Sequence, residues 1–513
     1  MDDIVGDSLR RVVKGAAIFL IGSVLGLFIA FIGRIIVIRY LTPAEFGLLS
    51  FSITVFTIAC SLANLGLPAG LTRQAAYFFG RGERERAIAI FRAGLLISVV
   101  ASLVAATGLF VSSDLIAEFF GMPGVSWILR MFSFAVPAAV LSATLVSVFQ
   151  VYERVDVKVV FSDLLPNVLR VALIVVVVIL TLSFYWVVSV YVLSYIIPGI
   201  VLLAYTFRFV EFKTSENTSK YIRILVLFSL PLLFQSVLGM IITWTDTLMI
   251  GYFLASSDVG LYSGARSLAG AMQNFLASVI FIYFPIISQL YARSQIKEMG
   301  RTYAVITKWL MSTSLPVFLV LFFFPEAVLW LLYGEAYIPA AHALQILALG
   351  FFTHVMLGPN GMTLIATGNV RFPTLASSIA AITNFALNLV LIPLYGITGA
   401  AVASALTYTT GNALTSAKLY MDYGIHPFTR NYVKPCLASL ATAALVYLIS
   451  KAFSLHIGSL ALVLLFVAFL SIYFLSLLLT RSFDREDIMI MLAIEERLGL
   501  DLSWVKRILR RFV

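Results

Sequence analysis

The chain of 513 residues is 61% hydrophobic and only 12% charged, about half the charged fraction of an ordinary soluble domain. Apolar runs of about 20 residues recur along most of it, and each is long enough to cross a membrane as a helix. The composition excludes an ordinary soluble protein and predicts an all-α polytopic membrane protein. The net charge of +10 would suit nucleic-acid binding, but the positions of the basic residues favour another explanation.

Apolar segments separated by polar or turn residues predict about fourteen transmembrane helices. In chain order they are expected at 15–38, 44–66, 88–112, 127–149, 159–182, 185–207, 224–253, 259–291, 305–332, 339–365, 373–395, 397–418, 434–453 and 458–480. The first run lacks the cleavage site of a signal peptide, so we expect it to remain a membrane helix. An even number of helices places both termini on the same side of the membrane.

The basic residues indicate which side that is. Most of the 35 lysines and arginines fall in the loops and tails on the side of the termini. The exceptions are Arg34, Arg39, Arg130, Arg170, Arg266 and Lys451. Basic residues concentrate on the cytoplasmic side of membrane proteins. We therefore predict a multi-pass protein of the cell membrane with cytoplasmic termini, and we attribute the net charge to topology rather than to nucleic-acid binding.

Residues 22–50 recur without a gap as residues 235–263. Such a repeat predicts two related halves, and an offset of six helices makes the halves parallel. The expected parts are an N-terminal lobe of six helices (1–209), a polar cytoplasmic linker (210–223), a C-terminal lobe of six helices (224–420), two further helices (421–480) and a basic tail (481–513). The tail is either an amphipathic helix on the inner leaflet or a solvated segment.

The two copies of the repeat differ in charge, because Gly33 and Arg34 correspond to Asp246 and Thr247. Ionisable groups within a membrane are costly and mark functional sites. We predict that Arg34 contacts a phosphate, since a guanidinium group binds two phosphate oxygens at once. A structural role is the alternative.

Other buried charges allow two interpretations each. Arg170, near the middle of its predicted helix, either binds a phosphate or pairs with Asp163 seven residues earlier. Asp246 and Arg266 are expected at equal depth on neighbouring helices. They either form a salt bridge or serve separately, with Arg266 on the substrate and Asp246 on a coupling cation. His354, isolated in an apolar helix, is expected to be a hydrogen-bonded core residue rather than a metal ligand.

Several ordered stretches carry a resemblance to a known family. They are RYLTPAEFGLLS (39–50), NLGLPAGLTRQAAYFFGRGE (64–83), DTLMIGYFLASSDVGLYSGA (246–265), YFPIISQLYA (283–292), LLYGEAYIPAAHALQILALG (331–350) and NFALNLVLIPLYGITGAAVASA (384–405). The chain resembles the polysaccharide-biosynthesis flippases of the O-antigen (Wzx) type, in the multidrug/oligosaccharidyl-lipid/polysaccharide (MOP) exporter superfamily. The resemblance implies helical lobes that rock around a central cavity and move a lipid-linked oligosaccharide from the inner to the outer leaflet.

The resemblance also extends to the lipid II flippase branch of this superfamily, which implies a sodium site. The matching positions are Asp246, Asn384, Asn388, Ala400 (through its carbonyl) and Ser404. That branch has a second carboxylate where this chain has Asn388, which weakens a cation site. Hydrogen bonding between helices is the alternative role for the asparagines. Coupling to Na⁺ or H⁺ stays open, and no other cofactor or metal is expected.

Two other functions are less consistent with these residues. A membrane-embedded glycan polymerase would need paired carboxylates or a metal motif, and the longest outer loop, 113–126, carries only Asp114 and Glu118. A drug or cation antiporter of the same superfamily would have twelve helices and acidic pockets. We therefore predict a monomeric flippase, not an enzyme, whose partners are membrane lipids and a polyprenyl phosphate or diphosphate bearing an oligosaccharide. Its predicted substrate-binding residues are Arg34, Arg170 and Arg266.

Overall fold

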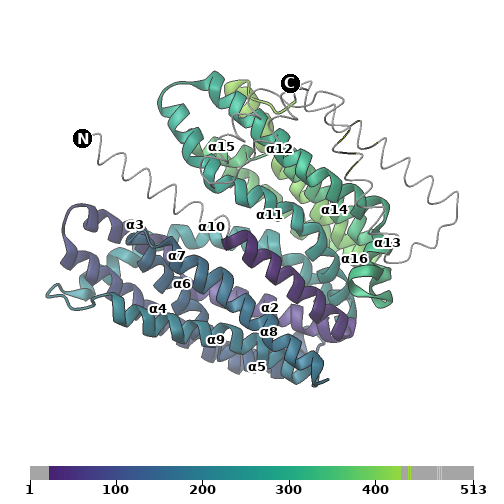
Figure 1. Cartoon of the computed structure of the whole chain (residues 1–513), viewed down its shortest axis with the longest axis horizontal. Helices are drawn as coiled ribbons and strands as arrows, with labels where there is room; N and C mark the ends of the chain where they lie inside the picture. The colour runs from purple at the N-terminus through teal and green to yellow at the C-terminus, as the bar shows by residue number, and fades with distance from the viewer. Residues whose placement is uncertain are drawn as a thin grey trace. The chain divides into compact units, whose positions relative to one another are not determined.

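The computed structural model describes residues 22–428 and five single positions further along, 437, 440, 471, 473 and 475. The predicted helices at 434–453 and 458–480, apart from those positions, and the tail lie outside the described residues. The described part consists of helices and connecting loops, without strands (Figure 1). Nine of its helices are long and apolar enough to cross a membrane, or ten if one bent pair is a single span. The predicted all-α polytopic class is confirmed.

Contacts between Cα atoms divide the chain into two compact units, Met1–Gly260 and Leu261–Val513. The lobe boundary at the linker 210–223 stays a prediction.

The first helix that the structure describes in this unit is Gly22–Tyr40. It continues with α2 (Pro43–Asn64), α3 (Leu67–Gly80), α4 (Arg84–Phe119), α5 (Val125–Ser133), α6 (Val136–Val151), α7 (Val155–Lys158), the π-helix η1 (Val159–Leu164), α8 (Leu165–Ile179), α9 (Phe184–Phe209) and α10 (Thr218–Phe253). A capping box between Thr42 and Glu45 starts α2, because each residue satisfies a backbone N–H that has no partner within the helix. Left-handed backbone at Leu65 and Gly66 separates α2 from α3.

The second unit continues from α11 (Ser256–Ala292), which begins at the end of the first. It contains α12 (Ile296–Phe323), α13 (Pro325–Tyr333), the 3-10 helix η2 (Glu335–Ala340), α14 (Ala341–Met356), α15 (Asn360–Ala366) and α16 (Arg371–Tyr423). Gly396 has φ 59° and ψ −140°, so α16 is two helices joined at a break. That break falls between the predicted helices 373–395 and 397–418.

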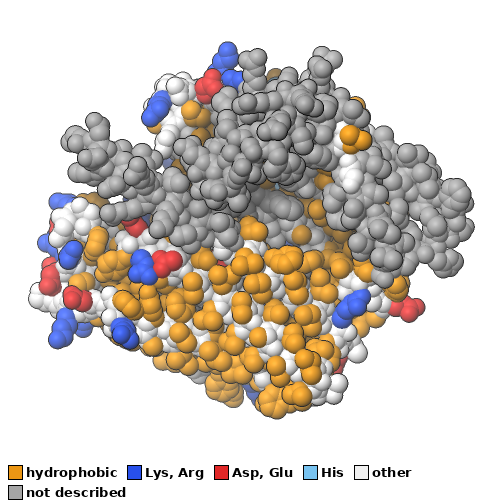
Figure 2. All heavy atoms as spheres, in the orientation of Figure 1, with side chains coloured by type: hydrophobic (Ala, Val, Ile, Leu, Met, Phe, Trp, Pro, Cys, Tyr) orange, Lys and Arg blue, Asp and Glu red, His pale blue; other side chains and the backbone are white. Residues whose placement is uncertain are grey.

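Many large apolar side chains face outward. Figure 2 shows a broad hydrophobic surface over the first unit. Exposed side chains include Val104 and Val111 on α4, Ile179 on α8 and Ile200 on α9. A continuous apolar surface of this kind is unfavourable in water and suits contact with lipid tails. It agrees with a multi-pass membrane protein.

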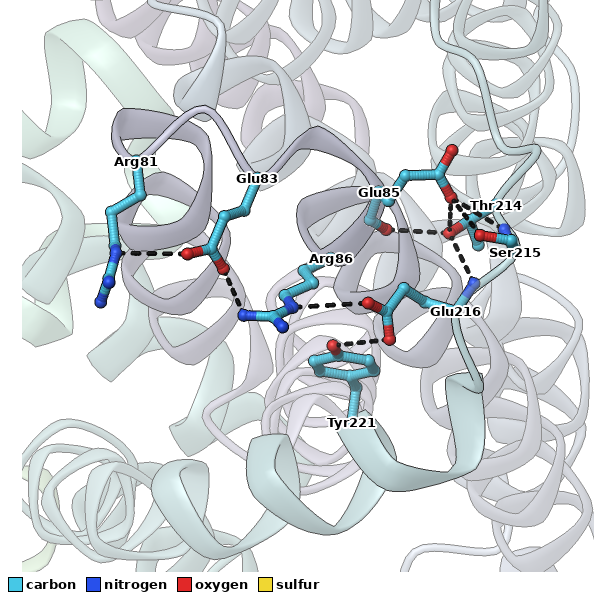
Figure 3. A network of polar contacts seen from close by, with 8 residues as sticks. All are labelled: Arg81, Glu83, Glu85, Arg86, Thr214, Ser215, Glu216 and Tyr221. Carbon is cyan, nitrogen blue, oxygen red and sulfur yellow. Dashed lines mark hydrogen bonds and ion pairs between the residues drawn. The ribbon is translucent and has the colours of Figure 1, made fainter.

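A polar network ties the segment after α9 to the start of α4 (Figure 3). The Glu85 carboxylate accepts hydrogen bonds from the Thr214 hydroxyl (2.8 Å), the Ser215 amide (2.8 Å) and the Ser215 hydroxyl (3.1 Å). Arg86 forms an ion pair with Glu216 at 3.4 Å. The non-helical residues 210–217 are therefore anchored to α4 within the first unit.

Candidate substrate and cation sites

Glycines bring the helix Gly22–Tyr40 into close contact with η1 and α8. A Cβ atom on Gly26 would lie 2.6 Å from the carbonyl oxygen of Asp163, and one on Gly33 would lie 2.6 Å from Cγ2 of Val171. Only small residues allow helices to approach this closely. The Ser23 hydroxyl donates a 2.6 Å hydrogen bond to the Asp163 carboxylate. The first helix therefore follows α8 along much of its length.

This contact brings together the helices that carry two predicted substrate residues, Arg34 and Arg170. Arg34 follows Gly33 and has an exposed side chain, while Arg170 precedes Val171 and is half-buried. Both guanidinium groups lie within electrostatic range of the Tyr191 hydroxyl on α9. The first unit thus brings Arg34 and Arg170 towards one region.

Arg170 is held by α9. Its Nε donates a 3.1 Å hydrogen bond to the Ser194 hydroxyl. Its Cζ lies 4.7 Å from the centre of the Tyr191 ring and 5.4 Å from that of Tyr195, distances at which a cation and an aromatic ring attract. Within residues 22–428, Nη1 and Nη2 of Arg170 form no hydrogen bond. The side chain is positioned while its two terminal nitrogens keep their donor capacity.

The alternative pairing of Arg170 with Asp163 is not found in the described part of the chain. Asp163 lies in the π-helix η1 and Arg170 in α8, and the wider π-helical turn changes which residues share a face. The Asp163 carboxylate instead accepts the hydrogen bond from Ser23.

Other arginines of this unit have acidic partners. Arg130 pairs with Asp114, and Arg154 pairs with Asp156 at 2.7 Å. Side-chain hydrogen bonding to Asp156 raises the pKa of Arg154 above its ordinary value. These two side chains are engaged in structural ion pairs, unlike Arg170.

The second unit holds four of the predicted cation ligands on α16. Asn384 and Asn388 lie before the break at Gly396, Ala400 and Ser404 lie after it, and all four are fully buried. Asp246 is also fully buried, but it belongs to α10 of the first unit. Its share in a cation site, like its pairing with Arg266, stays a prediction.

Arg266 on α11 contacts the part of α16 that follows the break at Gly396. Its Nη1 donates to the Ser404 hydroxyl at 3.4 Å, and the Tyr262 hydroxyl donates to the same oxygen at 3.4 Å. The Arg266 Cζ also lies 5.6 Å from the centre of the Phe351 ring. One predicted substrate residue and one predicted cation ligand are therefore in direct contact.

Sequence reasoning missed three residues of the Arg170 site. Tyr191, Ser194 and Tyr195 sit in an apolar run with no distinguishing motif. Their spacing of three and four residues puts them on one helix face, which is a signal only once Arg170 is known to face α9. His354 shares a hydrogen bond with Asn412, as expected of a hydrogen-bonded core histidine. No group of three metal-ligating side chains occurs among the residues that the structure describes.

The fold is that of a multi-pass helical membrane protein. It matches the lipid II flippase MurJ in an inward closed conformation with a TM-score of 0.74 at 14% identity, over 89% of this chain and 97% of that one. It matches an inward-facing multidrug resistance MATE transporter of the MOP superfamily with a TM-score of 0.66 at 12% identity, over 78% and 94%.

The chain belongs to the polysaccharide biosynthesis protein family, whose model matches residues 12–291. The MatE model matches residues 231–390. The predicted family and superfamily are confirmed.

Two relatives match the chain over part of their lengths. The chain is 27% identical over 218 residues to the probable low-salt glycan biosynthesis flippase of Haloferax volcanii, a match that covers 42% of this chain and only 46% of that protein. It is 22% identical over 417 residues to stage V sporulation protein B of Bacillus subtilis, covering 76% and 80%. The chain thus spans about half the length of the first relative and four fifths of the second.

Proposed function

We propose that this protein moves a polyprenyl phosphate or diphosphate bearing an oligosaccharide from the inner to the outer leaflet by alternating access, for cell-surface polysaccharide or glycoprotein glycan assembly. The observation that carries the proposal is the Arg170 site. A guanidinium group lies on a helix apolar enough to cross a membrane, is oriented by Ser194 and two tyrosine rings, and has no acidic partner among residues 22–428. Membership of the polysaccharide biosynthesis protein family and similarity to a probable glycan biosynthesis flippase support it.

The chemistry of the substrate fits this arrangement. A phosphate head group is anionic and strongly hydrated, so its passage through hydrocarbon is unfavourable without compensating contacts. The two Nη groups of Arg170 can donate to two phosphate oxygens in parallel. Arg34, within electrostatic range of the same tyrosine, adds a second positive charge. Arg266 would contact the substrate from the second unit.

We propose Na⁺ coupling through Asp246, Asn384, Asn388, Ala400 and Ser404. Carboxylate, amide, carbonyl and hydroxyl oxygens suit a hard cation, and full burial of all five residues would exclude competing water. Transport that is independent of Na⁺ and unaltered in Asp246→Asn would contradict this part of the proposal. Proton coupling would then be the remaining form of cation coupling.

The test is reconstitution of the full chain in vesicles with a fluorescent polyprenyl diphosphate sugar. Arg170→Ala is expected to slow translocation about 10- to 100-fold, the equivalent of losing charge-assisted hydrogen bonds worth about 1.5–3 kcal/mol. Arg170→Lys should retain part of the rate, because it keeps the charge without the paired donors. Arg130→Ala is the matched control, since Arg130 already pairs with Asp114.

Equal rates for Arg170→Ala and Arg130→Ala would refute the assignment of the site. In cells, deletion of the gene should cause lipid-linked glycan to accumulate on the inner leaflet. Absence of that accumulation would refute the function itself, whatever the outcome for Arg170.

A further inference from the structure

In the second unit, α14 and α16 pack against each other along three successive contacts. A Cβ on Gly350 would lie 2.5 Å from Cα of Ala405, so the two backbones almost touch. The Thr353 and Thr409 hydroxyls are 3.1 Å apart. Farther along, Nδ1 of His354 lies 2.5 Å from Nδ2 of Asn412. Among the side chains of these three contacts, the imidazole of His354 is the titratable group.

Asn412 joins three helices through its amide. Its Nδ2 also donates to the carbonyl oxygen of Tyr408 at 2.7 Å. Its Oδ1 accepts from Nδ2 of Asn360 on α15 at 3.2 Å. The same Asn360 nitrogen donates to the Ser416 hydroxyl at 2.8 Å. The cluster of His354, Asn360, Asn412 and Ser416, called here the α14–α16 joint, links α14 and α15 to α16.

The partners of Asn412 determine the state of His354. A rotated amide would set Oδ1 of Asn412 against the Tyr408 carbonyl and its NH₂ group against that of Asn360. Both contacts would be repulsive, so Nδ2 must face Tyr408 and His354. Nδ1 of His354 is then a hydrogen-bond acceptor. The joint is satisfied only by neutral imidazole with its proton on Nε2.

We propose that His354 is a proton-binding site and that proton binding opens the α14–α16 joint. A proton added at Nδ1 would place an N–H group against the Asn412 NH₂ group, and two donors cannot remain in contact at this distance. The proton comes from water, and no other bond changes. Imidazole ordinarily changes charge between about pH 5 and pH 8, which makes it the side chain of the joint that can gain a proton. The inference does not depend on which lipid is carried.

Other titratable groups lie on the helices of the joint and on the elements packed against them. Tyr408 on α16 lies 5.3 Å from the imidazole, ring centre to ring centre. From α12, Tyr303 donates its hydroxyl to the carbonyl of Leu357, and Lys308 is buried on the same helix. The remaining charged groups on these elements are Lys297, Glu298 and Arg301 on α12, Glu326 on α13, Glu335 on η2, and Arg371 and the Lys418–Asp422 ion pair on α16.

The effect of Asn412→Asp separates this proposal from general acid sensitivity. A carboxylate at position 412 would accept a hydrogen bond from protonated His354 and stabilise it. His354 should then gain its proton at a pH about one unit or more higher, and the protonated joint should stay closed, so the label distance should no longer increase on protonation. His354→Gln presents an acceptor at every pH, so it should abolish the transition.

The experiment uses the full chain in lipid nanodiscs with isotope-labelled histidine. The chain has four histidines, so the His354 signal is assigned from its loss in His354→Gln. Spin labels at the exposed positions Leu349 on α14 and Met421 on α16 report the helix distance, with Cys60 and Cys436 replaced by alanine. His342→Gln is the matched control, because His342 is exposed on the same helix.

We expect a neutral Nε2–H imidazole at high pH, and a change in the label distance at the pH at which the imidazole gains its proton. His342→Gln should retain this transition and His354→Gln should lose it. The proposal is overturned if His354→Gln changes distance at the wild-type pH, if protonation leaves the distance unchanged, or if His354 carries its proton on Nδ1. A joint that opens in Asn412→Asp as it does in the wild type when His354 gains its proton also overturns it.

Discussion

Two glycines at equivalent positions of the repeat, Gly47 and Gly260, each contact the helix that carries the other. A Cβ on Gly47 of α2 would lie 1.7 Å from the carbonyl oxygen of Ser256, and one on Gly260 of α11 would lie 2.0 Å from that of Pro43. In the repeat, position 47 corresponds to 260 and position 43 to 256. We therefore predict that Gly47→Ala and Gly260→Ala disturb the same contact.

The size of the effect follows from the clash. The Cβ of Gly47→Ala would lie about 1.3 Å closer to the Ser256 oxygen than the 3.0 Å below which real Cβ contacts essentially do not occur. The opposing atom is backbone and cannot rotate away, so α2 and α11 must move apart. Overpacking of this kind costs about 1–3 kcal/mol. Because the first substitution already separates the helices, the double variant should cost less than the sum of the two.

Thermal unfolding followed by labelling of the buried Cys60 measures this effect in a Cys436→Ala background. Gly108→Ala is the matched control, because Gly108 is helical and has nothing within 4 Å of its Cβ position. The stability of this control variant includes the gain of about 1 kcal/mol that comes from replacing a glycine by alanine within a helix. The midpoint for Gly47→Ala should fall below that of the control by about 2–4 °C per kcal/mol. Equal midpoints, or fully additive effects in the double variant, would refute the reasoning.

Three further predictions concern the first helix, the anchored segment and α16. Ser23→Ala should lower stability by about 1–3 kcal/mol in the same assay, because the part-buried Asp163 carboxylate loses a donor; an unchanged midpoint would contradict this. Glu85→Ala should speed cleavage within 210–217 during limited proteolysis, since its hydrogen bonds hold that segment; wild-type cleavage would argue against anchoring. Gly396→Ala should cost about 1–3 kcal/mol, because φ 59° and ψ −140° strain any residue with a Cβ; a neutral result would refute the break.

Hydropathy and turn residues predicted the helices closely where local composition decides them. The break at Gly396 separates two helices at the residue left between the predicted ranges. Other boundaries differ because packing, not hydropathy, sets them. The predicted helix 44–66 continues after a left-handed turn as α3, and the predicted helix 305–332 divides into α12 and α13 at Phe324.

The candidate site was only partly predictable. Arg170 was recognisable from sequence because a charge in an apolar run is costly wherever the helix packs. Tyr191, Ser194 and Tyr195 were not, since aromatic and small residues are common in membrane helices. Asp163 was an equally reasonable partner by spacing, but it lies in the π-helix η1 and accepts a hydrogen bond from Ser23 instead.

The sequence by itself determined that this is a helical membrane protein built on a repeat, with arginines at defined points in its apolar helices. These properties depend on the cost of placing each residue type in lipid, which is local. The tertiary structure decided which side chains meet. Arg170 and Ser194 are 24 positions apart, and Ser23 and Asp163 are 140 apart. Such contacts depend on which helices are neighbours and how closely glycines let them approach, and apolar periodicity does not encode either.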